Sequence, residues 1–121
     1  MSSLTVPREL SLADLDLQDP GSGKPIPYQF WGQQVKLVTE AGAETNTLAD
    51  PSKAGQRLDF IMRTDGGGNR VITAASALNQ AGNTIMTFAD VEDFIALTSV
   101  RKVGNVGFRW QVLSNDGVAL S

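Results

Sequence analysis

The stretch QRLDFIMRTDGGGNRVITAA, at residues 56–75, decides the fold class of this chain. In residues 56–63 the apolar side chains of Leu58, Phe60 and Met62 recur at every second position, as in a strand with one buried face. The TDGGGN segment at residues 64–69 is rich in glycine and asparagine, which adopt positive φ at little steric cost. Residues 70–75 then form a second β-rich run, so the stretch predicts a β-hairpin with a long loop.

Four more runs with β character surround this pair, at residues 34–40, 84–88, 93–100 and 107–113. The run at 93–100 is apolar or small on both faces, which predicts a central strand, and Phe108, Trp110 and Val112 are expected to face inward. For residues 40–54 a single helical turn is one interpretation. Short strands joined by Gly and Asn turns predict an all-β chain, folded as a single antiparallel β-sandwich or a small, jelly-roll-like barrel.

The distribution of proline divides the chain in two. All five prolines lie in the first 51 residues, and the 70 residues that follow contain none. Proline removes a backbone donor from a sheet ladder, so its clustering predicts an extended segment and its absence predicts paired strands. We therefore expect an extended N-terminal arm at residues 1–32 and one β-sandwich domain at residues 33–121.

The chain of 121 residues contains no histidine and no cysteine. These absences exclude a Ser-His-Asp or Cys-His nucleophile, an imidazole general base, a thiolate or imidazole zinc site and a disulfide. Chemistry based on carboxylates or lysine stays open, since these groups also act as general acids and bases. No constellation supports such chemistry, so we expect no enzyme, no catalytic residue and no cofactor.

The net charge of −3 has the wrong sign for a nucleic-acid-binding domain, because that binding depends on neutralising phosphates. The N-terminus has no basic stretch followed by an apolar one, and nowhere do about 18 apolar residues run together. The sequence therefore predicts no signal peptide, no membrane partner and no nucleic-acid partner.

Two polar motifs fit a structural interpretation better than a ligand-binding one. TDGGGN lacks the Lys-Ser/Thr pair and the helix that a phosphate-binding loop needs. Asp90, Glu92 and Asp93 offer oxygen ligands for calcium, or a carboxylate pair for glycoside hydrolysis. They lack the spacing of a calcium loop, and so short a chain leaves little room for a sugar cleft. We expect a plain loop at the first motif, a solvated acidic turn at the second, and no metal site.

The N-terminal arm carries the residues expected to bind a partner. Its apolar residues are regularly spaced, in a pattern that fits a short helix as well as a strand, but breakers keep them from forming a core of their own. The aromatic residues that follow are of a type enriched in interface hot spots, although they would equally plug the end of the sandwich. The expected partner-binding residues are Leu4, Val6, Leu10, Leu12, Leu15, Leu17, Tyr28, Phe30 and Trp31.

Five arginines lie in or beside the predicted strands: Arg57, Arg63, Arg70, Arg101 and Arg109. Spread over a sheet face, arginines protect the sheet from edge pairing, whereas across a subunit boundary they pair with acidic residues. Both interpretations stay open. Possible ion pairs between subunits involve Arg57, Arg63, Arg101, Asp59 and Asp93.

From residue 45 onward, a Thr-Leu pair, a proline, a glycine and an aromatic strand precede an Ile-Thr strand and a late Trp strand. The matching positions are Thr47-Leu48, Pro51, Gly55, Phe60, Ile72-Thr73, Phe94-Ile95 and Trp110. This order resembles that of small β-rich virion proteins of tailed bacteriophages, which include capsid decoration (cement) proteins and head or tail fibres. The resemblance covers nearly two thirds of the chain, leaves the first 32 residues outside, and implies a non-enzymatic virion component, commonly a homotrimer.

On this resemblance the leading expectation is a capsid decoration protein on the outer surface of the virion, made in the host cytoplasm. Its partners are the major capsid protein, bound through the arm, and other copies of itself. The alternative among virion proteins is a trimeric head- or tail-fibre or spike component that binds a host glycan or receptor. A carbohydrate-binding module with Trp31 or Trp110 as a stacking platform is a further alternative, although Trp110 is expected to face inward.

Overall fold

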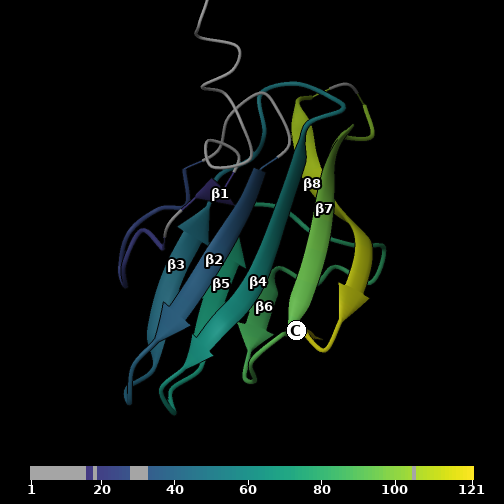
Figure 1. Cartoon of the computed structure of the whole chain (residues 1–121). Coiled ribbons are helices and arrows are strands. Elements are labelled where there is room, and N and C mark those ends of the chain that lie inside the picture. The colour runs from purple at the N-terminus through teal and green to yellow at the C-terminus, as the bar shows by residue number, and fades with distance from the viewer. Residues whose placement is uncertain (1–15, 18, 28–32, 105) are drawn as a thin grey trace, which may run out of the picture.

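We describe the protein from a computed structural model that places residues 16–17, 19–27, 33–104 and 106–121. In these ranges nine strands form two sheets that pack together (Figure 1). Sheet A has the order β1-β2-β4-β7-β8, with the bounds Asp16–Leu17, Gln33–Thr39, Arg57–Asp65, Phe94–Arg101 and Phe108–Asp116. Sheet B has the order β3-β5-β6-β9, with the bounds Glu44–Leu48, Arg70–Ala74, Ile85–Phe88 and Ala119–Leu120. The predicted all-β sandwich is confirmed.

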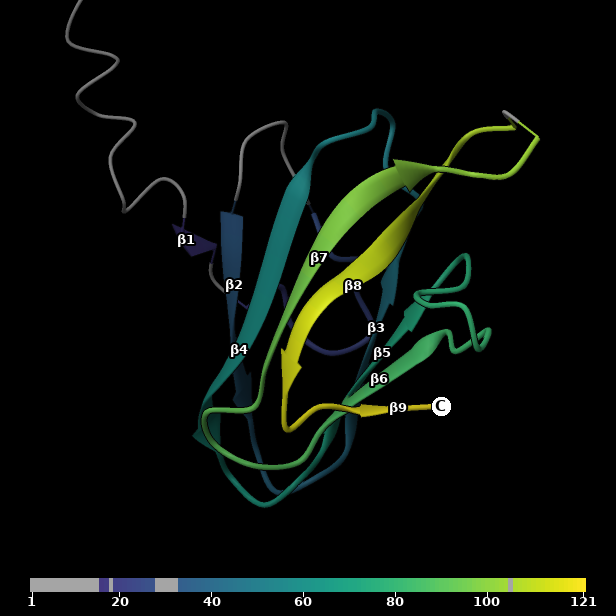
Figure 2. The ribbon, with the colours of Figure 1, turned by 90° about the vertical axis from the view of Figure 1, so that its right-hand side faces the viewer.

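Both sheets are mixed. The pairs β4–β7, β7–β8, β5–β6 and β6–β9 run antiparallel, as expected. The pairs β1–β2, β2–β4 and β3–β5 run parallel, so the expected antiparallel pairing is wrong for these three. The parallel pairs β2–β4 and β3–β5 arise because the chain crosses from sheet A to sheet B after β2 and again after β4 (Figure 2). Equivalent strands of the two crossings therefore lie side by side.

The predicted hairpin at residues 56–75 is wrong. Strand β4 lies in sheet A and β5 lies in sheet B, so TDGGGN is an arch that joins the two sheets. Phe60 of β4 and Ile72 of β5 are both fully buried in the same core. A hairpin and an arch look alike in sequence, because each combines two strands that have one buried face with a glycine-rich connection.

The glycines of this arch are required by a second arch, residues 40–43, which packs against it between β2 and β3. The Gly66 N–H donates to the Thr39 carbonyl at 2.9 Å, and the Gly68 N–H donates to the Glu40 carbonyl at 2.8 Å. A β-carbon at Gly66 would fall against the backbone of Thr39 and Glu40, and one at Gly68 would fall against the Gly42 carbonyl. Only residues without a side chain let the two arches stack this closely.

We expect Gly68→Ala to lower the free energy of unfolding by about 2 kcal/mol, because the added β-carbon has no space in this packed contact. Gly42→Ala is the matched control in the opposing arch, since a β-carbon there meets nothing within 4 Å. Its stability should stay within about 0.5 kcal/mol of the wild type. Chemical denaturation measures both variants, and equal stabilities would contradict the stacking argument.

The predicted core faces are confirmed. Leu58, Phe60 and Met62 are fully buried, and Trp110 is 1% exposed. Val112, on the same strand as Trp110, is half-buried and packs against the core. Phe108 is also half-buried, but its ring lies under the Arg101 guanidinium, so its predicted place in the core is not confirmed. Strand β7 lies between β4 and β8, in agreement with its predicted central position. Residues 40–54 contain β3 in place of a helical turn.

Candidate functional site

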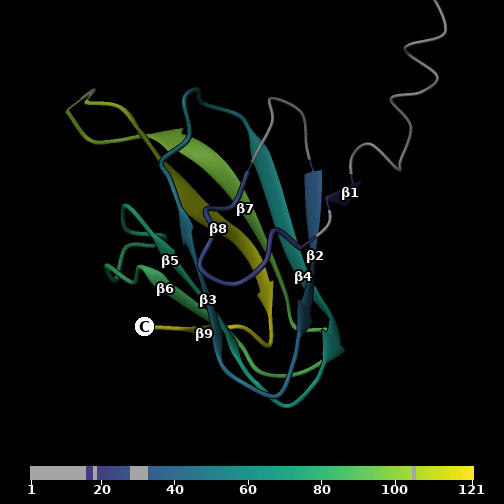
Figure 3. The same ribbon diagram turned by 90° about the vertical axis from the view of Figure 1, so that its left-hand side faces the viewer.

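Residues 19–27, which we call the strap, run along β3 at the edge of sheet B (Figure 3). The Gly23 N–H donates to the Thr45 carbonyl at 2.7 Å, and the Ile26 N–H donates to the Thr47 carbonyl at 2.8 Å. The Ile26 side chain is 4% exposed and belongs to the core. The strap therefore covers the edge of β3 and is itself part of the packed structure.

The fully buried side chain of Arg70, the first residue of β5, ties the strap to both sheets. Its Nη2 forms ion pairs with Asp19 of the strap and, at 2.9 Å, with Glu44 of β3. The same atom donates to the Val38 carbonyl of β2 at 2.9 Å. Its Nη1 donates to Asp19 at 3.0 Å and to Asn46 Oδ1 at 2.8 Å. One guanidinium group thus joins the strap to sheet A and to sheet B.

The partners of Arg70 make further bonds between the strap and the sandwich. Asp19 accepts a hydrogen bond from the Val38 N–H at 2.8 Å. The buried amide of Asn46 donates to the carbonyls of Gly21 and Lys24 at 2.8 and 2.9 Å. We call Asp19, Glu44, Asn46 and Arg70 the Arg70 cluster. Because its charges are largely withdrawn from water, removing one partner leaves the others unpaired in a poorly solvated place.

Asp19 keeps its negative charge in this cluster at unusually low pH. Burial raises the pKa of Asp19. Hydrogen bonds from Arg70 and from the Val38 and Gly21 N–H groups, together with the charge of Arg70, lower the pKa by more than burial raises it. The net effect is a pKa below the ordinary value of 3.8. A carboxylate with a lowered folded-state pKa stabilises the fold above its unfolded-state pKa, and this contribution is lost as the pH falls through the lowered value.

We expect the free energy of unfolding to fall as the pH drops below about 4, where an unfolded aspartate takes up its proton. Asp19→Asn removes the titrating group. The stability difference between the wild type and this variant should be largest at neutral pH and should shrink in acid. Urea denaturation over a series of pH values measures both curves, and a constant difference would contradict the role assigned to Asp19.

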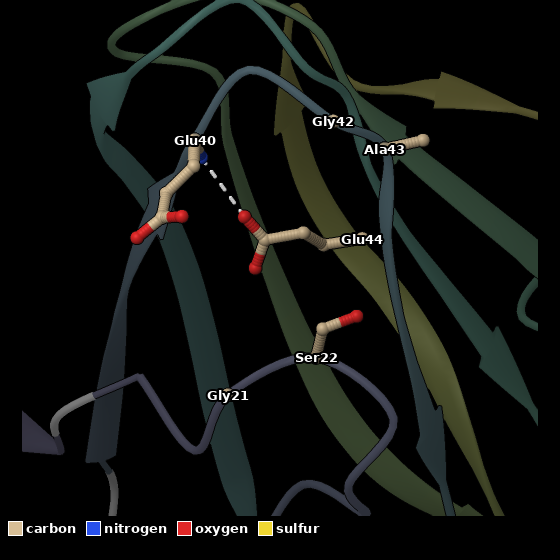
Figure 4. Close-up of a pocket in the computed structure, with 6 residues that line it drawn as sticks. All are labelled: Gly21, Ser22, Glu40, Gly42, Ala43 and Glu44. Atoms are coloured by element: carbon tan, nitrogen blue, oxygen red, sulfur yellow. Dashed lines mark hydrogen bonds between the residues drawn. The ribbon is translucent and has the colours of Figure 1, made fainter.

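An open hollow beside the cluster is lined by Gly21, Ser22, Glu40, Gly42, Ala43 and Glu44 (Figure 4). The Glu44 carboxylate is already engaged, because Oε1 accepts from Arg70 and Oε2 accepts from the Glu40 N–H, each at 2.9 Å. In the part of the chain that the structure describes, no group of three or more acidic residues is placed to hold a metal ion. The hollow separates the strap from the arch at residues 40–43.

Most of the predicted partner-binding residues lie outside the described residues: Leu4, Val6, Leu10, Leu12, Leu15, Tyr28, Phe30 and Trp31. Leu17 lies in β1, which pairs in parallel with β2 at the edge of sheet A. The N-terminal part of the chain is therefore joined to the sandwich twice, by β1 at sheet A and by the strap at sheet B. The domain boundary at residue 32 stays a prediction.

The candidate arginines for subunit contacts have partners within the chain. Arg57 Nε lies 2.9 Å from Asp59 Oδ1 on the same strand, and this pair is partly exposed. Arg63 lies 3.4 Å from Glu92. The Arg101 guanidinium stacks over the Phe108 ring, 4.8 Å from its centroid. Pairing of these residues across a subunit boundary stays a prediction.

The acidic turn at residues 90–93 is only partly as expected. Asp90 and Glu92 are exposed, as in a solvated turn. Asp93 is buried, so that interpretation is wrong for this residue: its carboxylate accepts hydrogen bonds from the Ala89 and Asp90 N–H groups at 2.9 and 3.0 Å. Asp93 closes the turn between β6 and β7.

The Arg70 cluster is not among the sites predicted from the sequence. Arg70 is predicted to lie on a sheet face or at a subunit boundary, and both interpretations are wrong because its side chain is fully buried. One signal was present, since Arg70 has the same strand parity as the inward-facing Ile72 and Ala74. Its partner Asp19 lies 51 positions away, and no spacing rule connects residues so distant.

Within the described residues, no helix is long and apolar enough to span a bilayer. No protein-family model matches this chain, and no curated protein matches it.

Proposed function

We propose that this chain is a capsid decoration (cement) protein, a non-enzymatic component of a tailed-phage virion. Its N-terminal arm binds the major capsid protein on the outer surface of the head, and its β domain forms a homotrimer that links neighbouring capsomers. The observation that supports this proposal best is the Arg70 cluster, which binds Asp19, the first residue of the strap, to both sheets.

A protein that clamps a shell transmits force from its bound segment to its folded body. Residues 1–15 lead directly into β1, and the strap begins at Asp19, two residues after β1 ends. Breaking a buried ion pair by removing one partner costs about 3–5 kcal/mol. A force that pulls on the arm therefore acts on the ion pair between Asp19 and Arg70, which is bonded to strands of both sheets.

The leucine-rich composition of the arm suits its binding to the capsid protein. Each leucine that becomes fully buried on a partner contributes about 1.5–3 kcal/mol. Several modest contacts from copies joined in one trimer add up to tight attachment, because the second and third arms bind at high effective concentration. The resemblance to virion proteins covers residues 45–121, most of the β domain, and the leucines of the arm supply the attachment.

Deleting residues 2–15 tests the arm while leaving β1, Asp19 and the strap in place. We expect the truncated chain to keep the unfolding temperature of the full chain and to lose binding to shells assembled from the major capsid protein of the same genome. Cosedimentation measures binding. As a second test, replacing Leu10 and Leu12 with Asn in the full chain should weaken binding at unchanged stability.

Full binding by the truncated chain would show that residues 2–15, with the leucines they carry, are not the attaching segment. Binding of the full chain to host glycans on an array, together with no binding to capsid shells, would contradict the decoration role and indicate the fibre or spike role. The stability measurement separates both outcomes from simple misfolding.

A further inference from the structure

The outward face of sheet B carries no charged side chain among the described residues. Side chains alternate between core and surface along a strand, and Ile72 and Ala74 of β5 are buried, so Val71 and Thr73 face outward. The sheet register aligns residues of β3 and β6 with these two. We call the resulting surface the threonine face: Thr45, Thr47, Val71, Thr73, Ile85 and Thr87.

Sheet A has the same alternation but a different surface. Its outward positions include Lys36 on β2 and Arg57, Asp59 and Arg63 on β4, which mix charges of both signs. Charged residues on an outward sheet face keep that face in water and discourage association. Their absence from sheet B marks its outward face as the surface better suited to burial.

The composition of the threonine face favours another copy of this chain as its partner. Residues near a rotation axis face the same residues of a symmetry-related copy, so any charge placed there meets a like charge. The whole chain carries a net charge of −3, which makes two copies repel wherever charged surfaces approach. A charge-free face is the one on which copies meet at the lowest electrostatic cost.

Threonine also makes the face chemically self-complementary. Its hydroxyl both donates and accepts a hydrogen bond, so threonine pairs with threonine without a second residue type. Thr45, Thr47 and Thr73 are exposed, whereas Val71, Ile85 and Thr87 are half-buried. A shallow, mainly apolar hollow lined by Pro25, Thr47, Ala49, Thr73 and Ala75 lies at one end of the face and offers a seat for a neighbour's side chain.

We propose that the threonine face lies on the rotation axis of a homo-oligomer and packs against the same face of neighbouring copies. The number of copies, three, rests on the proposed function, whereas the choice of face rests on the charge pattern and on the threonines of that face. Three copies that turn this face toward a common axis leave sheet A, with β1 at its edge, on the outside and available to a shell.

Thr73→Glu tests the proposal in the full chain, because Thr73 is exposed near the middle of the face and the variant places like charges together at the axis. Light scattering should give three times the monomer mass for the wild type and the monomer mass for Thr73→Glu. Thr98→Glu is the matched control on the outward face of sheet A, where Thr98 pairs with Arg57 of β4. It should keep the wild-type mass.

A charge-swap mixture guards against misfolding as the explanation. Thr73→Glu and Thr73→Lys should each be monomeric alone and should assemble in part when mixed, because a mixed trimer replaces two of its three like-charge contacts at the axis with opposite-charge ones. A wild type that stays monomeric at high concentration would overturn the proposal, as would a Thr73→Glu variant with the wild-type mass. A dimer that Thr73→Glu dissociates would support the face and contradict the trimer of the proposed function.

Discussion

Arg70→Met should lower the free energy of unfolding by about 3–5 kcal/mol, the cost of removing one partner from a buried ion pair. Methionine fills a similar volume but leaves the Asp19 and Glu44 carboxylates, whose side chains are only 14% and 16% exposed, without a counter-charge. Urea denaturation of the full chain measures the loss. This is a large fraction of the stability of a domain, about 5–15 kcal/mol.

Arg57→Met is the matched control, because the Arg57 side chain is 47% exposed and its pair with Asp59 lies at the surface. A pair of this kind contributes about 0–1 kcal/mol. Adding Asp19→Asn and Glu44→Gln to Arg70→Met should recover part of the lost stability, since no unpaired carboxylate then remains. Equal losses for Arg70→Met and Arg57→Met would refute the anchoring role of Arg70.

Arg70→Met should also loosen the strap before the sandwich opens. Hydrogen exchange of the Gly23 and Ile26 amides, which donate to Thr45 and Thr47, reports on the strap alone. We expect these two amides to exchange faster by more than the amides shared by β4 and β7. Uniform loss of protection across the chain would mean that the strap and the sandwich open as one unit.

Trp110→Ala should cost about 3–5 kcal/mol, as is usual when a large buried aromatic residue is truncated. The Trp110 side chain is 1% exposed and is among the largest in the core, and its indole Nε1 donates to the Ala49 carbonyl at 3.0 Å. Truncation removes both the packing and this link between β8 and the segment that follows β3. Chemical denaturation of the variant measures the loss.

Leu113→Ala is the control on the same strand, because Leu113 is 55% exposed, and its stability should stay within about 0.5 kcal/mol of the wild type. A small effect of Trp110→Ala would contradict the packing described for β8. The burial of Trp110 also bears on the carbohydrate-binding alternative, since a ring enclosed in the core presents no face on which a sugar can stack.

The positions of the strands were largely predictable from the sequence. The alternation of Leu58, Phe60 and Met62 reflects a sheet with one buried face, and that requirement holds whichever strands are neighbours. The pairing was not predictable, because an arch and a hairpin need the same glycine-rich connection. What separates them is the second arch at residues 40–43, and its contact with Gly66 and Gly68 is invisible in a local pattern.

Strand β3 was missed for a different reason. Its inward side includes Asn46, a polar residue that breaks the apolar alternation expected of a buried face. Asn46 is tolerated there because it bonds Arg70 and two carbonyls of the strap. Buried polar residues that satisfy one another across long sequence distances leave no periodic signal, and the Arg70 cluster was hidden for the same reason.

The most direct test of the decoration role is the temperature at which capsid shells fall apart, measured by light scattering with and without the full chain. A cement protein should raise this temperature until its sites on the shell are saturated, and the chain lacking residues 2–15 should leave it unchanged. Shells that fall apart at the same temperature in the presence of saturating full chain would contradict the proposed function.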